Sequence, residues 1–121
     1  MASKEVLEVG KFQKQLSDFA KEREWEQFHS PKNIAMALSV EASELMEIFQ
    51  WKTTDESREL CEKDLRKVQE EVADVFLYTM RMADLLNINI GEAIESKMEQ
   101  NAQKYPVDKS RGNSKKYNEL D

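Results

Sequence analysis

The stretch SPKNIAMALSVEASELMEIFQW, from Ser30 to Trp51, decides the fold. Ser30 followed by Pro31 is a helix start: the Ser side chain caps a free backbone N–H, and Pro at the first helical position loses no hydrogen bond. Apolar residues then recur at the three- and four-residue spacing of one helix face: Ile34, Leu38, Ala42, Leu45 and Phe49. We therefore predict a helix from residue 31 to about residue 51.

Before this stretch, a second apolar stripe predicts a helix over residues 6–25, with a break at residues 27–29. The stripe comprises Val6, Val9, Phe12, Leu16 and Phe19. After the stretch, residues 52–57 form a polar connection with room for a short helix as far as Leu60. The longest predicted helix then covers residues 62–86, and its inward face comprises Leu65, Val68, Val72, Val75, Phe76, Thr79 and Ala83.

A fourth helix is expected after Asn89, which can cap it, with Glu92 placed as in a capping box. It carries Ala93, Ile94, Met98 and Ala102 and stops at Tyr105, because the residue before Pro106 avoids the helical conformation. The remaining residues, 106–121, are polar and without period. They are predicted to be either a loose terminus or an arm, with a net positive charge, that closes over an anionic ligand.

Composition agrees with a single all-α domain over residues 1–121. The chain has 3 Gly and 2 Pro, too few for a turn-dense β protein, and no run of alternating strand residues. The expected architecture resembles a four-helix bundle. Five methionines lie on the predicted helices and suggest faces buried against other subunits: Met36, Met46, Met80, Met82 and Met98.

The charge and cysteine content exclude several functional classes. With 18 basic and 24 acidic residues the net charge is −6, which disfavours binding to nucleic acid or to a membrane surface. No stretch is apolar enough for a membrane span, and residues 1–11 lack the core of a signal peptide. One Cys and one His exclude a disulfide framework and a Cys- or His-based metal site. A lone thiol, Cys61, fits a reducing compartment, so a cytoplasmic protein is expected.

Acidic residues are the informative feature. Glu41 and Glu44 lie three apart on one predicted helix, and Glu71 and Asp74 lie three apart on another. If the helices pack antiparallel, the four carboxylates meet, and a cation must then compensate them or their pKa values must rise. Mg²⁺, or Mn²⁺ in its place, suits an all-oxygen site. The alternative is that these acids are solvating residues of exposed helix faces.

The pattern Glu41-x-x-Glu44 … Glu71-x-x-Asp74 resembles the signature of the all-α nucleotide pyrophosphohydrolases, a superfamily that includes MazG. The flanking sequences look like the dCTP pyrophosphatase branch, and the resemblance extends over residues 12–117. The flanking sequences that carry the resemblance are WEQFHSPKN at residues 25–33, FQWK at 49–52, SKMEQN at 96–101 and KYP at 104–106.

The resemblance implies hydrolysis of a nucleoside triphosphate, dCTP in particular, to the monophosphate and pyrophosphate. Glu41, Glu44, Glu71 and Asp74 would hold Mg²⁺ and form the catalytic centre. Glu44 is the candidate general base and Glu47 the alternative. The resemblance also implies a homo-oligomer, a dimer or a dimer of dimers, with sites built from more than one chain. Preference for another base, or a non-catalytic helical oligomerisation module, are the alternative functions.

The expected substrate-binding residues supply the remaining chemistry. Trp25 and Trp51 offer aromatic faces on which a base stacks, although each is also a plausible core or interface residue. Leu16 departs from the family pattern, which tends to have a polar residue there, and takes no role. The other expected contacts are Phe28 and His29 at the pocket, the Tyr78 hydroxyl toward sugar or phosphate, the Asn101 amide toward a pyrimidine edge, and Lys97, Lys104 and Arg111 toward the triphosphate.

Overall fold

The structure, a computed structural model, describes residues 5–121 and contains helices and no strand within them, which confirms the all-α prediction. The chain forms two compact units that meet in sequence between Asn87 and Ile88. Each is described by itself, so a single domain over residues 1–121 stays a prediction. None of the helices in the described residues combines the length and the apolar character that crossing a membrane requires. The first unit holds α1 (Val9–Glu22), η1 (Glu26–Phe28), α2 (Pro31–Phe49), α3 (Thr54–Arg58) and α4 (Glu62–Leu85).

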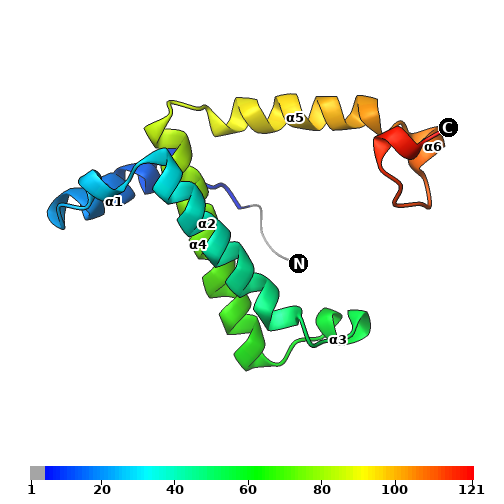
Figure 1. Ribbon diagram of the computed structural model, residues 1–121, viewed down its shortest axis with the longest axis horizontal. Helices are drawn as coiled ribbons and strands as arrows, with labels where there is room; N and C mark the ends of the chain where they lie inside the picture. The colour runs from blue at the N-terminus through cyan, green and yellow to red at the C-terminus, as the bar shows by residue number, and fades with distance from the viewer. Residues whose placement is uncertain (1–4) are drawn as a thin grey trace. The chain divides into compact units, whose positions relative to one another are not determined.

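Helices α2 and α4 form an antiparallel pair that is the frame of the first unit (Figure 1). The predicted start of α2 is confirmed, since the backbone N–H of Asn33 donates to the Ser30 hydroxyl at 3.1 Å. Among residues 5–121, four apolar side chains are buried and form the small core: Ala20, Ile34, Met80 and Ala83. Helix α1 packs against α4, and the Gln13 side-chain amide donates to the carbonyl of Met80 at 3.1 Å.

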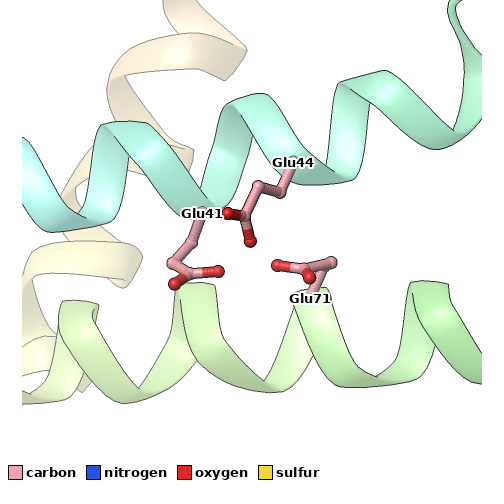
Figure 2. A group of neighbouring side chains, drawn as sticks. All are labelled: Glu41, Glu44 and Glu71. Carbon is pink, nitrogen blue, oxygen red and sulfur yellow. The ribbon is translucent and has the colours of Figure 1, made fainter.

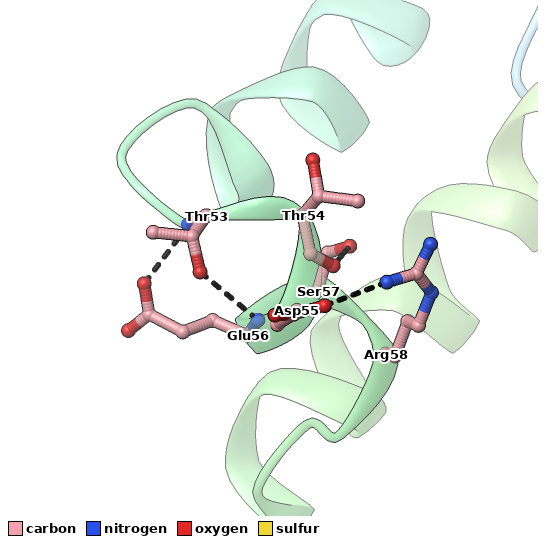
Figure 3. Close-up of polar contacts among 6 residues, drawn as sticks. All are labelled: Thr53, Thr54, Asp55, Glu56, Ser57 and Arg58. Carbon is pink, nitrogen blue, oxygen red and sulfur yellow. Dashed lines mark hydrogen bonds and ion pairs between the residues drawn. The ribbon is translucent and has the colours of Figure 1, made fainter.

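The connection between α2 and α4 is held by local hydrogen bonds and one ion pair. Thr53 and Glu56 form a complete capping box at the start of α3, in which each residue's backbone N–H donates to the other's side chain (Figure 3). Lys52, just after α2, pairs with Asp64, in the first turn of α4, at 2.9 Å. These contacts fix where the second helix of the pair begins and therefore how far it slides along the first.

The turn after α1 positions Trp25. The backbone N–H of Trp25 donates to the carbonyl of Ala20 at 2.8 Å, and that of Glu24 donates to Lys21 at 3.1 Å. This is the Schellman pattern, which needs a left-handed residue after the helix. Glu24 takes that position with φ of 55°, where glycine is the usual residue.

In the first unit, the structure differs from two predictions made from the sequence: where α1 begins, and which residues of α4 are buried. Helix α1 begins at Val9, not at Val6, and no side chain caps its first turn. The predicted inward residues Val72 and Phe76 of α4 are 40% and 52% exposed. Periodicity identifies an apolar helix face but not the element that covers it, and this unit has only one layer of helices on α4. The predicted core is therefore much larger than the core within the unit.

The second unit contains α5 (Ile90–Lys104), α6 (Val107–Ser110) and η2 (Tyr117–Glu119). Asn89 caps α5 as predicted, accepting from the backbone N–H of Glu92 at 3.0 Å. Residues 106–121, in which the sequence shows no period, contain the short helix α6 and the turn η2; a loose terminus and an arm that closes over a ligand stay predictions. Pro106 begins a short helix, because its carbonyl accepts from Ser110 at 3.0 Å. The ring of Tyr117 then meets that of Tyr105 edge-on, with centroids 6.4 Å apart.

Candidate active site

Three carboxylates meet between α2 and α4, as Figure 2 shows. Glu41 and Glu44 extend from α2 and Glu71 from α4, and one oxygen of each lies within 4.8 Å of the others. Residues three apart share a helix face, so the spacing in the sequence aims the two α2 side chains at the same place. We call Glu41, Glu44 and Glu71, together with Asp74 one turn further along α4, the carboxylate group.

The carboxylate group carries uncompensated negative charge. The pKa of Glu41 is raised to about 7, first by the adjacent Glu71, with which it would share a proton, then by burial and by the charges of Glu44 and Asp74. One buried oxygen of Glu41 and one of Glu71 have no hydrogen-bond partner. A buried carboxylate oxygen without a hydrogen-bond donor is costly. The carboxylate group therefore needs a partner that the protein atoms around it do not supply.

These observations fit a divalent cation. The donor set contains only carboxylate oxygen, which hard cations such as Mg²⁺ and Mn²⁺ prefer, and no thiolate or imidazole that would favour zinc. The two buried oxygens without partners, on Glu41 and Glu71, are the atoms that a cation would satisfy. A divalent cation would therefore be held by Glu41, Glu44 and Glu71, with Asp74 next to them.

A cavity of about 350 Å³ lies between α1 and α4 in the first unit. Asp74 belongs to its lining, so the cavity borders the carboxylate group. Of the sequence-predicted substrate residues, Trp25, His29 and Tyr78 also line it. The remaining lining residues are Phe12, Gln15, Leu16, Phe19, Leu77 and Arg81. A volume of this size is typical of small-molecule sites.

The polar and aromatic side chains of the cavity are held by their neighbours. The Trp25 ring meets Phe19 edge-on at 5.7 Å between centroids and lies 6.5 Å from the His29 ring. Arg81 donates from Nε to Nδ1 of His29 at 3.2 Å. Burial, and then the positive charge of Arg81, lower the pKa of His29. Burial raises the pKa of Tyr78, with a further contribution from Glu41 and Asp74.

The structure does not bring every predicted residue to this cavity. Phe28 and Trp51 are 58% and 89% exposed and are not part of the lining. Glu47 is exposed and lies outside the three-carboxylate cluster. Four predicted residues belong to the second unit, so their contact with substrate stays a prediction: Lys97, Asn101, Lys104 and Arg111.

Sequence reasoning missed two polar residues of the cavity, Gln15 and Arg81. Arg81 lies seven residues after Asp74, two helical turns along the same face of α4, and this spacing was a usable signal. Gln15 is the polar member of a helical stripe with Phe12 and Phe19. Leu16, to which no role was given because it departs from the family pattern, is part of the lining.

Comparison with known proteins shows the family to which the chain belongs. The model of the MazG-like family matches residues 36–120, and the chain belongs to this family. It is 42% identical over 106 residues to dCTP pyrophosphatase 1 of Mus musculus and 41% identical over 106 residues to that of Homo sapiens. Each match covers 86% of this chain and 62% of the relative, so the chain spans about three fifths of the length of these curated proteins.

A solved structure is similar over nearly its whole length. A pyrophosphatase from Archaeoglobus fulgidus is 38% identical, with a TM-score of 0.77, and the match covers 88% of this chain and 99% of that one. The resemblance stated from the four-acid pattern and its flanks is confirmed at the level of the family.

Proposed function

We propose that the protein is a nucleoside triphosphate pyrophosphohydrolase that depends on a divalent cation and acts on dCTP and its modified forms. One observation carries the proposal: a carboxylate group with unpartnered buried oxygens borders a cavity of about 350 Å³ whose lining includes the aromatic rings of Phe19 and Trp25. The relatives named dCTP pyrophosphatase 1 support cytosine as the base of the substrate. These relatives and the archaeal pyrophosphatase both support the class of reaction.

In the proposed reaction, water attacks the α-phosphorus of dCTP. The bond from phosphorus to the oxygen that bridges the α- and β-phosphates breaks, and the products are dCMP and pyrophosphate. Glu41, Glu44, Glu71 and Asp74 hold the cation, for which Mg²⁺ is proposed and Mn²⁺ is an acceptable substitute. When bound, the cation withdraws charge from the phosphate and lowers the pKa of nearby water. Glu44 accepts the proton of the attacking water, with Glu47 as the alternative base.

The nucleoside part of the substrate occupies the cavity. Trp25, which is 43% exposed at the rim, offers its face to the base. The Tyr78 hydroxyl is available to the sugar or to a phosphate oxygen, and His29 to the base. Residues of the second unit complete the site in this proposal: Asn101 reads the pyrimidine edge, and Lys97, Lys104 and Arg111 neutralise the triphosphate.

We also propose a homo-oligomer, either a dimer or a dimer of dimers, in the cytoplasm. The support is the exposed apolar surface of the first unit, including Met36, Met46 and Phe76. Monomeric proteins rarely leave so many large apolar side chains uncovered. Trp51 does not line the cavity of its own unit, so its stacking role and that of Phe28 belong to a neighbouring chain's site.

The experiment is pyrophosphate release from a panel of ribo- and deoxynucleoside triphosphates, with Mg²⁺ and with EDTA. We expect dCTP to be the fastest substrate, no release in EDTA, and a loss of at least about 100-fold in Glu71→Gln. Glu70→Gln, which changes the exposed neighbour on the same helix, is the matched control and should retain activity. If no triphosphate is cleaved with any metal, the protein is a helical oligomerisation module; equal rates on all bases would remove the dCTP preference.

A mixing experiment tests whether sites are shared between chains. Glu71→Gln and Trp51→Ala should each be impaired, but oligomers that contain both variants should recover part of the activity, since some sites then combine an intact Glu71 with a neighbour's intact Trp51. If mixed oligomers stay as inactive as the two separate variants, Trp51 does not serve a neighbouring site.

A further inference from the structure

Arg81 is the one charged residue that is buried within residues 5–121, with only 6% of its surface exposed. Taking a guanidinium out of water is costly unless it is paired. The nearest carboxylate is that of Asp84, 3.8 Å from Nη1, which is beyond hydrogen-bond distance, and Asp84 itself is 41% exposed. A structural arginine would be expected to hold a carboxylate more closely. The short contact of Arg81 is with His29 instead.

The contact has a fixed direction. A guanidinium only donates hydrogen bonds, and it stays protonated in proteins. In the bond of 3.2 Å from Arg81 Nε, the Nδ1 atom of His29 must therefore be the acceptor and carry no proton. A neutral imidazole then has its proton on the other nitrogen, so His29 has Nε2–H available as a donor. The lowered pKa of His29 is consistent with the neutral ring.

We propose that Arg81 is a positioning residue that fixes His29 in the Nε2–H form and thereby makes this part of the cavity select a hydrogen-bond acceptor on the base. His29 Nε2–H and the guanidinium N–H groups not used by His29 are all donors. Cytosine presents adjacent acceptors at O2 and N3, whereas uracil and thymine have a proton on N3. Uracil and thymine still offer acceptors at O2 and O4, so the preference for cytosine arises where the two donors face the adjacent O2 and N3 of the base together. The base preference rests on the proposed function, but the state of His29 does not.

His29 is the only histidine of the chain, so its ring nitrogens give an unambiguous NMR signal in protein without a histidine tag. A long-range ¹H–¹⁵N spectrum of the unliganded protein above pH 7 distinguishes the two neutral tautomers. We expect the Nε2–H form alone in the wild type. Arg81→Met, which keeps the buried volume and removes the donor, should give a mixture of both tautomers.

Two further variants separate the hydrogen bond from the charge and guard against misfolding. Arg81→Gln keeps an N–H donor without the charge, and Arg81→Lys keeps the charge with a different donor geometry. We expect Arg81→Gln to retain the Nε2–H form to a greater extent than Arg81→Met. A wild type with the proton on Nδ1, or an Arg81→Met spectrum identical to the wild type, would overturn the proposal.

Kinetics test the consequence for base preference. The ratio of kcat/KM for dCTP to that for dUTP should fall about tenfold in Arg81→Met, the effect of about one hydrogen bond, and Arg81→Gln should restore part of it. Because Arg81 acts through His29, Arg81→Met should cause little further loss of selectivity in a His29→Phe background.

The two arms fail in different ways. If the wild type cleaves neither nucleotide, the proposed function is wrong, and the NMR spectra still decide whether Arg81 fixes His29. If the tautomer changes in Arg81→Met while the dCTP to dUTP ratio does not, the selectivity proposed for this donor surface is wrong although the positioning of His29 holds.

Discussion

Asp74 and Arg81 lie about 10 Å apart along the axis of α4, and both line the same cavity. The regions around these two residues have opposite charge and opposite hydrogen bonding. Near Asp74, like charges crowd together, and buried oxygens of Glu41 and Glu71 have no protein partner. Near Arg81, the charge is opposite in sign and the hydrogen bond to His29 is already made. The first region is complete only with a cation, whereas the second is organised by the chain itself.

The two regions should respond differently to solution conditions. The carboxylate group should change in stability with pH and with divalent cation, because its electrostatic repulsion is relieved by either a proton or a metal ion. The part formed by Trp25, His29 and Arg81 should not respond to divalent cation, and its response to pH comes only from His29, whose pKa is lowered.

Thermal stability should change most. Mg²⁺ at about a hundred times its Kd stabilises by about 2.7 kcal/mol and should raise the melting temperature by roughly 10 °C. Without cation, the melting temperature should fall as pH rises from 4.5 to about 7. In this window folded Glu41 keeps a proton that the unfolded chain has lost, so deprotonation favours unfolding. Differential scanning fluorimetry, with and without Mg²⁺, measures both.

Glu41→Gln is the control for this prediction. It should remove the loss of stability between pH 4.5 and 7 and most of the Mg²⁺ shift. The single histidine acts in the opposite direction: its lowered pKa means that stability rises with pH up to about 6.5. A variant profile that is flat or rising is therefore expected. A fall as steep as in the wild type would show that the carboxylate group is not its source.

A smaller effect, on nucleotide binding, is expected when Trp25 at the rim of the cavity is changed. Trp25→Ala should weaken binding of a non-hydrolysable dCTP analogue by about 1–3 kcal/mol, because a base loses its stacking surface. Trp25→Phe should retain most of the affinity. Isothermal titration in the presence of Mg²⁺ measures both variants. The Mg²⁺ shift in melting temperature should be unchanged in each; if it disappears in Trp25→Ala, the two regions are not independent.

The smallest expected effect concerns the turn that positions Trp25. Glu24 is left-handed, with φ of 55°, a conformation that is strained for any residue with a Cβ. Glu24→Gly should stabilise the protein by roughly 0.5 kcal/mol, after allowance for the greater freedom of glycine in the unfolded chain. Urea unfolding measures the change, and Glu24→Val should destabilise. If Glu24→Val stabilises the protein, the backbone at residue 24 is not strained.

Local signals in the sequence predicted most of the helical framework. The starts of α2 and α5 follow from Ser30 and Asn89, whose side chains cap the next turn, and short-range chemistry of this kind can be read from adjacent residues. The meeting of Glu41, Glu44 and Glu71 followed from three-residue spacing together with antiparallel packing. Both steps need only helix geometry and a short connection.

Other features depend on contacts between distant residues, which the spacing of residue types along the sequence does not reveal. The bond between Arg81 and His29 joins residues 52 positions apart, and nothing in either local sequence specifies it. The predicted inward side of α4 was apolar, but whether Phe76 meets this chain or another is a question of assembly. The short helix after Pro106 depends on a few hydrogen bonds and on one aromatic contact between Tyr105 and Tyr117.

The short connection between α2 and α4 has a consequence for how the protein folds. Glu41 and Asp74 belong to one continuous helix–connection–helix segment, so bringing the four acids together closes only a small loop and loses little chain entropy. Contacts of low sequence separation form fast. We therefore expect this hairpin, with its ion pair between Lys52 and Asp64, to form early in folding, before α1 docks and closes the cavity.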